Sequence, residues 1–142
     1  MDTIECSGVR VALDIGNDGI AAAHFNGLLL PGNIQAVNAI TLGVAAGCGV
    51  KGLLYRADRA AVCCDAQSMA ASYPTLTPLQ RRVPVAFVVN RAQAALSERL
   101  VQRAGAAGLL RRTFYGPAEA HEWLTQTARL LRNNNDWWLT RA

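Results

Sequence analysis

The first part of the chain alternates between apolar and polar positions. The alternation runs from Val9 to Asp14, and a second apolar run extends from Ile20 to Phe25. Both segments predict β-strands, because successive side chains of a strand point to opposite faces. Between them, Asn17, Asp18 and Gly19 are typical of a tight turn, in which Gly19 adopts a positive φ without strain. The sequence therefore predicts an opening β-hairpin.

Beyond the hairpin, the pattern switches between a helical period and short apolar runs. Further strands are predicted over 51–57, 84–89 and 109–115, and helices over 33–47, 91–104 and 117–131. The run 84–89 is apolar without a break, which is typical of a central strand. Strands that alternate with helices imply a largely parallel sheet with right-handed crossovers. We expect an α/β fold in the order β-β-α-β-α-β-α-β-α, with helices packed on a mixed five-stranded sheet and the hairpin at one edge.

The stretch that follows the third strand has a less regular pattern. Either Asp58 or Asp65 could cap a helix that continues to about residue 71. Pro74 and Pro78 then break the pattern, so we expect an exposed connection over 75–82.

The last third of the chain is the most informative for the fold class. Residues 112–115 predict a short strand, and Gly116 followed by Pro117 predicts a turn into the first position of a helix. The apolar face of that helix begins with Ala120, Trp123 and Leu124. None of these residues forms a recognisable catalytic group, so the segment indicates a fold and not a reaction.

Length and charge exclude several classes of protein. With 142 residues the chain is expected to be one domain, 1–142, with 132–142 as a C-terminal tail. The net charge is +4, but 13 of the 14 basic residues are arginines scattered along the chain, which argues against a nucleic-acid surface. The N-terminus is acidic, unlike a signal peptide, and no uncharged apolar run suits a membrane span. We therefore expect a cytoplasmic protein.

Candidate cofactor and metal ligands do not occur at the required spacing. The four cysteines include no Cys-x-x-Cys pair, and neither histidine lies near a cysteine. No glycine-rich segment has the spacing of a phosphate loop. The adjacent Cys63 and Cys64 are better explained as two small apolar residues at a helix start than as a redox pair. We expect no metal and no cofactor.

Neither histidine suggests catalysis. His24 lies within a predicted strand, and His121 lies on the last predicted helix, where it would be half exposed. Neither has a serine or cysteine nucleophile and a carboxylate close to it in the sequence. We therefore expect no catalytic residues and no enzymatic activity.

Taken together, the layout from Val9 to Leu131 resembles the STAS-like fold, and more narrowly its SpoIIAA-like (STAS/SEC14-like) branch. The most specific part of the resemblance is the ending, where a basic residue, an aromatic strand position and an Ala-x-x-Trp-Leu helix follow one another from Arg112 to Leu124. The resemblance implies a binding or regulatory module without catalysis.

The resemblance also implies where a regulatory switch would lie. In the bacterial antagonist branch, the partner is an anti-sigma kinase, and a serine at the start of the helix after the central strand is phosphorylated. The corresponding stretch here, 55–61, contains Asp58 and no serine or threonine, and the nearest hydroxyl belongs to Ser68. Asp58 and Arg59 are therefore the candidate switch or partner-binding residues. Asp58 either mimics a fixed negative charge or simply caps the helix.

Two functions from different classes follow. The first is a regulatory or protein-interaction module whose partner is another protein or a second copy of the chain, as a homodimer. The second is a module that binds a small apolar molecule or a lipid in a cleft near the glycine-rich segment 43–52. An apolar cavity of several hundred cubic ångströms would favour the ligand, and a filled interior with a flat apolar patch would favour the protein partner.

The C-terminal tail carries one further candidate site. Trp137, Trp138 and Leu139 form an apolar group after a run of three asparagines. Exposed indoles are costly in water, so we expect these residues to be buried, either as dimer contacts or against their own domain.

Overall fold

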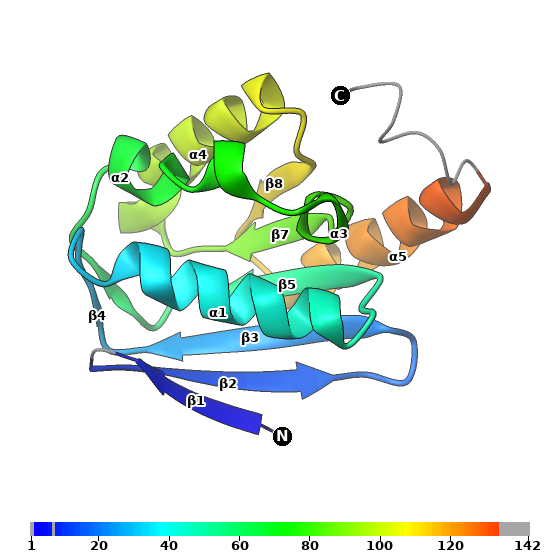
Figure 1. Cartoon of the computed structure of the whole chain (residues 1–142), viewed down its shortest axis with the longest axis horizontal. Coiled ribbons are helices and arrows are strands. Elements are labelled where there is room, and N and C mark those ends of the chain that lie inside the picture. Colours follow the sequence, from blue (N-terminus) through cyan, green and yellow to red (C-terminus); the bar gives the residue numbers. More distant parts are fainter. Residues whose placement is uncertain (1, 7, 134–142) are drawn as a thin grey trace.

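The structure, a computed structural model, describes residues 2–6 and 8–133 (Figure 1). Its main sheet has six strands in the order β1-β2-β3-β5-β7-β8. These strands are β1 (Asp2–Cys6), β2 (Val9–Ile15), β3 (Ile20–Asn26), β5 (Gly52–Arg56), β7 (Val85–Val88) and β8 (Arg111–Phe114). A separate two-stranded sheet joins β4 (Leu28–Leu29) to β6 (Ala61–Val62).

Helices connect these strands. They are α1 (Ile34–Gly47), α2 (Ala66–Ala70), α3 (Pro78–Arg81), α4 (Ala94–Ala106) and α5 (Pro117–Asn133). Two short 3₁₀ helices, η1 (Tyr73–Thr75) and η2 (Arg91–Gln93), precede α3 and α4. Since α5 continues to Asn133, the first two residues of the expected tail belong to this helix. Among the described residues, no helix has both the length and the apolar character needed to cross a membrane.

The α/β class and the mixed sheet are confirmed. β1, β2 and β3 are antiparallel, whereas β3, β5, β7 and β8 run parallel to one another. The expected count of five strands is wrong, because β1 adds a sixth strand at the edge. Ile4 and Cys6, which pair with Val11 and Val9, are partly buried against the core, so β1 has the same alternation as the hairpin. β1 and not the hairpin forms the outer edge.

The turn of the hairpin forms as its residues predict. Gly19 has a φ of +83°, and the Asp18 carboxylate accepts a hydrogen bond of 3.0 Å from the Ile20 amide. This local bond supports the chain reversal. β3 then continues into the sheet and pairs in parallel with β5, which places the hairpin next to the central strands.

Helices cover the two faces of the sheet unequally (Figure 1). Residues of α1, α2 and α4 share a core with one face, whereas α5 covers the other face. On the first face the centre of the core contains Phe25, Leu53, Tyr55, Phe87 and Leu100. The cluster under α5 is smaller and contains Leu54, Ala86, Phe114, Ala120 and Leu124.

The region between β5 and β7 differs most from expectation. No helix begins at Asp58, and α2 has only five residues. Its N-cap is Asp65, whose carboxylate accepts a bond of 2.7 Å from the Ser68 amide. The expected connection over 75–82 contains α3, which Thr77 and Gln80 cap reciprocally. The sequence signal for α3, a threonine three residues before a glutamine with proline between them, was present.

Candidate functional site

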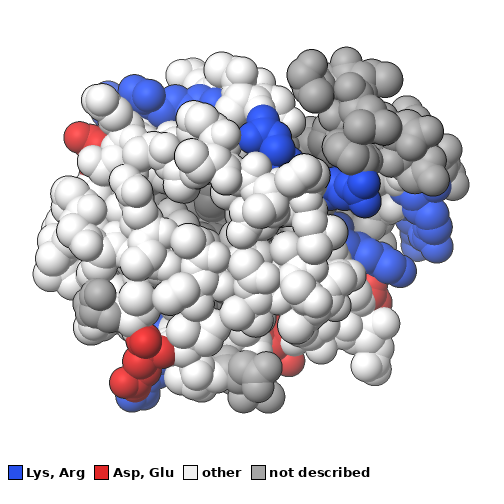
Figure 2. Space-filling model, viewed as in Figure 1, with Lys and Arg blue, Asp and Glu red and all other residues white. Residues whose placement is uncertain are grey.

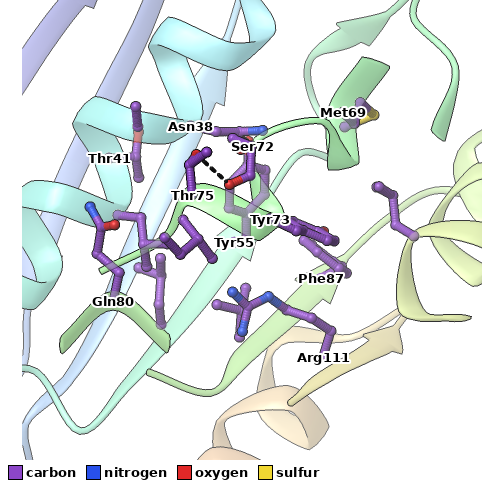
Figure 3. A pocket seen from close by; sticks show the side chains of 16 residues that line it. Asn38, Thr41, Tyr55, Met69, Ser72, Tyr73, Thr75, Gln80, Phe87 and Arg111 are labelled. Carbon is purple, nitrogen blue, oxygen red and sulfur yellow. Dashed lines mark hydrogen bonds between the residues drawn. The ribbon is translucent and has the colours of Figure 1, made fainter. Parts of the chain in front are cut away.

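A cavity of about 160 Å³ lies between α1, the segment from η1 to α3, and the sheet. Figure 3 shows that its walls come from segments far apart in the sequence. Asn38 and Leu42 belong to α1, Tyr55 to β5, and Tyr73 and Gln80 to the segment from η1 to α3. Apolar side chains from the sheet and from α2 and α4 complete the lining: Leu53, Met69, Val85, Phe87 and Leu100.

Aromatic side chains on adjacent strands support the cavity. Tyr55 stacks on Phe25 with a centroid distance of 3.9 Å and meets Phe87 edge to face at 5.6 Å. The Tyr55 hydroxyl bonds to the side-chain oxygen of Asn38 on α1. Because Tyr55 is buried, its pKa is raised far above the ordinary value, and the hydroxyl stays neutral. Its hydroxyl thereby links α1 to the central strand beside the cavity.

Arg111 is the charged residue of the cavity lining. Its side chain extends from β8 towards the other labelled side chains (Figure 3), and the residue is only 8% exposed. Nη1 donates to the carbonyl oxygens of Val83 and Leu110, each at 3.0 Å. Burial lowers the pKa of Arg111 to about 10, so the guanidinium remains charged at neutral pH. Within the described residues, no carboxylate forms a salt bridge with it.

Tyr73 and Arg81 surround Arg111 without neutralising it. Arg111 donates a hydrogen bond to the Tyr73 hydroxyl, but burial raises the pKa of Tyr73 above its ordinary value, so the phenol stays uncharged. Arg81 donates to the Tyr73 carbonyl at 3.0 Å and to the Ala107 carbonyl. Its positive charge also contributes to the lowered pKa of Arg111. The inner side of the cavity is therefore electropositive.

The mouth of the cavity is uncharged. Figure 2 shows a hollow near the middle of this face, with charged side chains towards the periphery. Asn38, Ser72, Thr75 and Gln80 line the pocket with polar groups and are at least partly accessible. Gly43 on α1 lies opposite Gln80, with a Cβ position 3.8 Å from Nε2. None of residues 43–52 lines the cavity, so the cleft expected at this segment does not coincide with it.

Asp58 and Arg59, the expected switch residues, lie in an ordered loop at the carboxyl end of β5, outside this cavity. Asp58 is not a helix cap, because no helix begins there, and its carboxylate pairs with Arg56 at 3.1 Å. The Asp58 carbonyl accepts a bond from the Asn90 side chain, and Gln93 donates to the carbonyls of Ala57 and Ala60 at 2.8 and 3.0 Å. The loop is therefore fixed by side chains that follow β7.

An exposed strip adjoins this loop. β4 and β6 place Leu28 beside Ala61, and the Cys63 amide bonds to the Leu29 carbonyl. Leu28 and Leu30 are 44% and 39% exposed, and Ala61 and Cys63 are exposed as well. We call Leu28, Leu30, Arg59, Ala61 and Cys63 the loop-end surface. It combines apolar groups with the exposed cation of Arg59.

The remaining chemical candidates do not assemble into a site. His121 Nε2 lies 2.7 Å from the Asp18 carboxylate in an exposed pair that joins α5 to the hairpin turn. None of the four cysteines forms a disulfide within the described chain, and burial raises the pKa of Cys64, which makes its thiol less reactive. No group of three His, Cys, Asp or Glu side chains suits a metal among residues 2–6 and 8–133. Trp137, Trp138 and Leu139 lie outside the described residues.

The sequence held a signal for Arg111 that the pattern analysis missed. Arg111 and Arg112 are adjacent in a strand, so their side chains point to opposite faces of the sheet. Because helices cover both faces at β8, at least one of two adjacent arginines must lie under a helix. Arg111 is buried on the cavity face, and Arg112 lies exposed over the Phe114 ring at 5.2 Å.

These elements form an α/β sandwich with a mixed sheet. No protein-family model matches the sequence, and a comparison with curated proteins finds no match. Among solved structures, the fold is similar to that of an anti-sigma factor antagonist from Mycobacterium paratuberculosis, with a TM-score of 0.53 and 10% sequence identity. The alignment covers 82% of this chain and 93% of that one. The STAS-like fold expected from the sequence is confirmed.

Proposed function

We propose that the protein is a non-catalytic regulatory module that binds a protein partner through the loop-end surface. The observation that carries the proposal is the rigid presentation of this surface. Side chains of Asn90 and Gln93 hold the loop from Ala57 to Ala60 by three hydrogen bonds to its carbonyl groups. A loop held in one conformation loses little entropy when it binds.

The composition of the surface supports a protein as the partner. Leu28 and Leu30 supply exposed apolar area beside the charge of Arg59, and interfaces commonly combine apolar contacts with an arginine. The similarity to an anti-sigma factor antagonist supports the same class of function, because an antagonist of an anti-sigma factor acts on another protein. Asp58, paired with Arg56, contributes by fixing the backbone beside Arg59.

Site-specific photo-crosslinking in the cells that carry the protein tests the proposal. A photoreactive residue at position 59 should capture one defined protein, whereas the same residue at position 129, exposed on α5, should not. The captured protein is then purified, and its affinity is measured by calorimetry. Arg59→Glu should weaken binding by roughly tenfold or more, and Arg129→Glu should leave it unchanged. Equal capture at both positions, or none at position 59, would reject the loop-end surface.

A second copy of the chain is the other partner to be tested. We propose that Trp137, Trp138 and Leu139 contact it, since two indoles carry a large apolar area. Light scattering before and after removal of residues 136–142 measures the contribution of this segment. Loss of a dimer with an intact circular dichroism spectrum supports the contact. An unchanged dimer, or a monomer in both cases, rejects it.

A further inference from the structure

We infer that the cavity between α1, α3 and the sheet binds a small organic acid, with one carboxylate on Arg111 and a compact apolar body in the core. This site is separate from the loop-end surface and does not depend on the proposed protein partner. The inference rests on four features of the cavity: its charge, its volume, its lining and its mouth.

The positive charge of the cavity favours an anionic ligand. Arg111 lines it at 8% exposure, and no carboxylate of the described residues pairs with it. Tyr73 is neutral, and Arg81 adds positive charge nearby. A buried charge without a counterion is unfavourable, and an anion that reaches it gains charge-assisted hydrogen bonds in a low-dielectric setting. An anionic ligand would therefore relieve an existing electrostatic cost.

The volume limits the ligand to a compact molecule. The cavity measures about 160 Å³. Apolar protein cavities of ~150 Å³ accommodate benzene, so a body of about six to eight heavy atoms fits. This volume lies below the several hundred cubic ångströms typical of sites for drug-sized ligands. A lipid with two acyl chains is excluded unless the surrounding segments move apart.

The lining favours a carboxylate on an apolar body over a phosphate ester. Leu53, Met69, Phe87 and Leu100 provide an apolar wall, and one buried guanidinium matches one negative charge. A phosphate monoester carries a charge of about −1.5 to −2 and needs more donors than Arg111 supplies. Arg81 is already committed to the carbonyls of Tyr73 and Ala107. Arg111 already donates to the carbonyls of Val83 and Leu110 and bonds to Tyr73, so the few N–H groups that remain suit the single charge of a carboxylate better than a phosphate.

The polar residues near the mouth provide a route for such a ligand. Asn38, Thr75 and Gln80 are accessible, and no acidic side chain lies at the rim of the hollow on this face (Figure 2). An anion approaching Arg111 would therefore meet no carboxylate at the entrance.

Calorimetric titration of the full chain with benzoate tests the inference, with benzyl alcohol as the neutral counterpart and inorganic phosphate as the anion without an apolar body. Benzoate should bind, benzyl alcohol should bind more weakly, and phosphate should not bind. Arg111→Met retains much of the side-chain volume and removes the charge, and should weaken benzoate binding by roughly tenfold to a hundredfold. Arg112→Met, the neighbour on the opposite face, is the matched control and should bind as the wild type does.

Two further measurements locate the bound probe and guard against a variant that fails to fold. Met69 lines the cavity, so its ¹³C-labelled methyl resonance should shift on addition of benzoate. Leu42→Phe extends a ring from α1 into the cavity and should abolish binding without touching Arg111. The inference is overturned if folded wild-type protein does not bind benzoate. It is also overturned if phosphate or benzyl alcohol binds as well as benzoate, or if folded Leu42→Phe retains full affinity.

Discussion

The two faces of the sheet are packed in different ways. On one face, the 17 residues of α5 form a single continuous helix over the sheet. Small residues allow close approach there, since a Cβ on Gly52 would lie only 3.1 Å from Leu124 Cδ2, and Ala86 and Ala120 are fully buried. On the other face, the cover consists of α1, α4 and several short helical turns, and it leaves the cavity beside Tyr55 and Arg111.

The difference shows how a cavity can arise in a well-formed fold. One amphipathic helix can match a sheet surface along its whole length, because every apolar side chain comes from the same regular element. Where several separate segments pack on a sheet, gaps remain at the boundaries between the segments. Large side chains such as Tyr55, Tyr73 and Arg111 fill such a boundary incompletely. The closely packed face stabilises the sheet, whereas the boundary between α1 and the segment from η1 to α3 provides space for a ligand.

The strongest test of the comparison is Leu124→Ala on the closely packed face. Leu124 is fully buried against the sheet, so truncation should leave a cavity and lower the free energy of unfolding by about 3 kcal/mol. Urea denaturation followed by circular dichroism measures the change. Leu130→Ala on the same helix is the control, because Leu130 is 69% exposed and should change stability by less than about 0.5 kcal/mol. Equal effects of the two variants would contradict the packing described for α5.

Gly52→Ala adds a single methyl group to the same interface. The new Cβ would lie 3.1 Å from Leu124 Cδ2 and 3.2 Å from Ile20 Cδ1, so both side chains must shift. We expect a loss of about 1 to 2 kcal/mol in the free energy of unfolding, measured by the same denaturation. Gly47→Ala has no neighbour within 4 Å and should be neutral or slightly stabilising. A neutral Gly52→Ala would mean that the interface is looser than its geometry indicates.

Arg111→Met probes the cavity face and should have a smaller effect on stability. The substitution removes the two hydrogen bonds to Val83 and Leu110, but it also removes a buried charge without a counterion. These opposing contributions should leave the free energy of unfolding within about 1 kcal/mol of the wild-type value. A loss as large as that of Leu124→Ala would show that Arg111 is chiefly a structural residue.

The smallest effect is expected where α5 meets the hairpin turn at the surface. The pKa of Asp18 lies below 3.8, first because its carboxylate accepts a bond from the Ile20 amide and then because His121 is adjacent. Since the folded-state pKa is lowered, the stabilising contribution is present above pH 3.8 and is lost as the pH falls through the folded-state value. Asp18→Asn keeps an acceptor for Ile20, and should cost only a few tenths of a kcal/mol at neutral pH for this exposed pair.

The measurement for Asp18→Asn is the difference in unfolding free energy from wild type as a function of pH. The gap should close in acid below the ordinary pKa of an aspartate. A gap that widened as the pH fell would have the wrong sign for a carboxylate stabilised in its charged form.

Regular periodicity explains which parts of the fold the sequence predicted. The hairpin, α1, α4 and α5 carry their own repeating patterns and turn residues, so local information is sufficient for them. β1 was missed because the N-terminal segment was considered only for its acidic charge, and its short alternation of apolar and polar residues was not used. The helix start after β5 stayed open between Asp58 and Asp65, because the conformation of the loop at Asp58 depends on Gln93, which donates to Ala57 and Ala60 from beyond the next strand. Such tertiary bonds leave no local pattern in the sequence.

The candidate sites also divide into those that local sequence indicates and those that depend on tertiary packing. Asp58 and Arg59 were located by their position after a predicted strand, and they lie together in a loop. The cavity was not predictable, because it depends on how closely α1 and the segment from η1 to α3 approach one another. Arg111 could have been suspected from its adjacent arginine, but which of the two would be buried depends on how the helices cover the sheet.

The short helices η1 and α3, which cover the cavity, also determine how easily it can open. None of the residues of η1 or α3 is fully buried, and Arg81 joins this segment to the end of α4 through the Ala107 carbonyl. Detaching such a segment costs less than unfolding the sheet, so it should open while the rest of the molecule remains folded. Backbone amides such as that of Arg81, which bonds to Thr77, should exchange with solvent deuterium much earlier than those of β5. Such local opening would widen the entrance between α1 and the segment from η1 to α3, so that a molecule larger than the folded cavity could enter while the sheet stays intact.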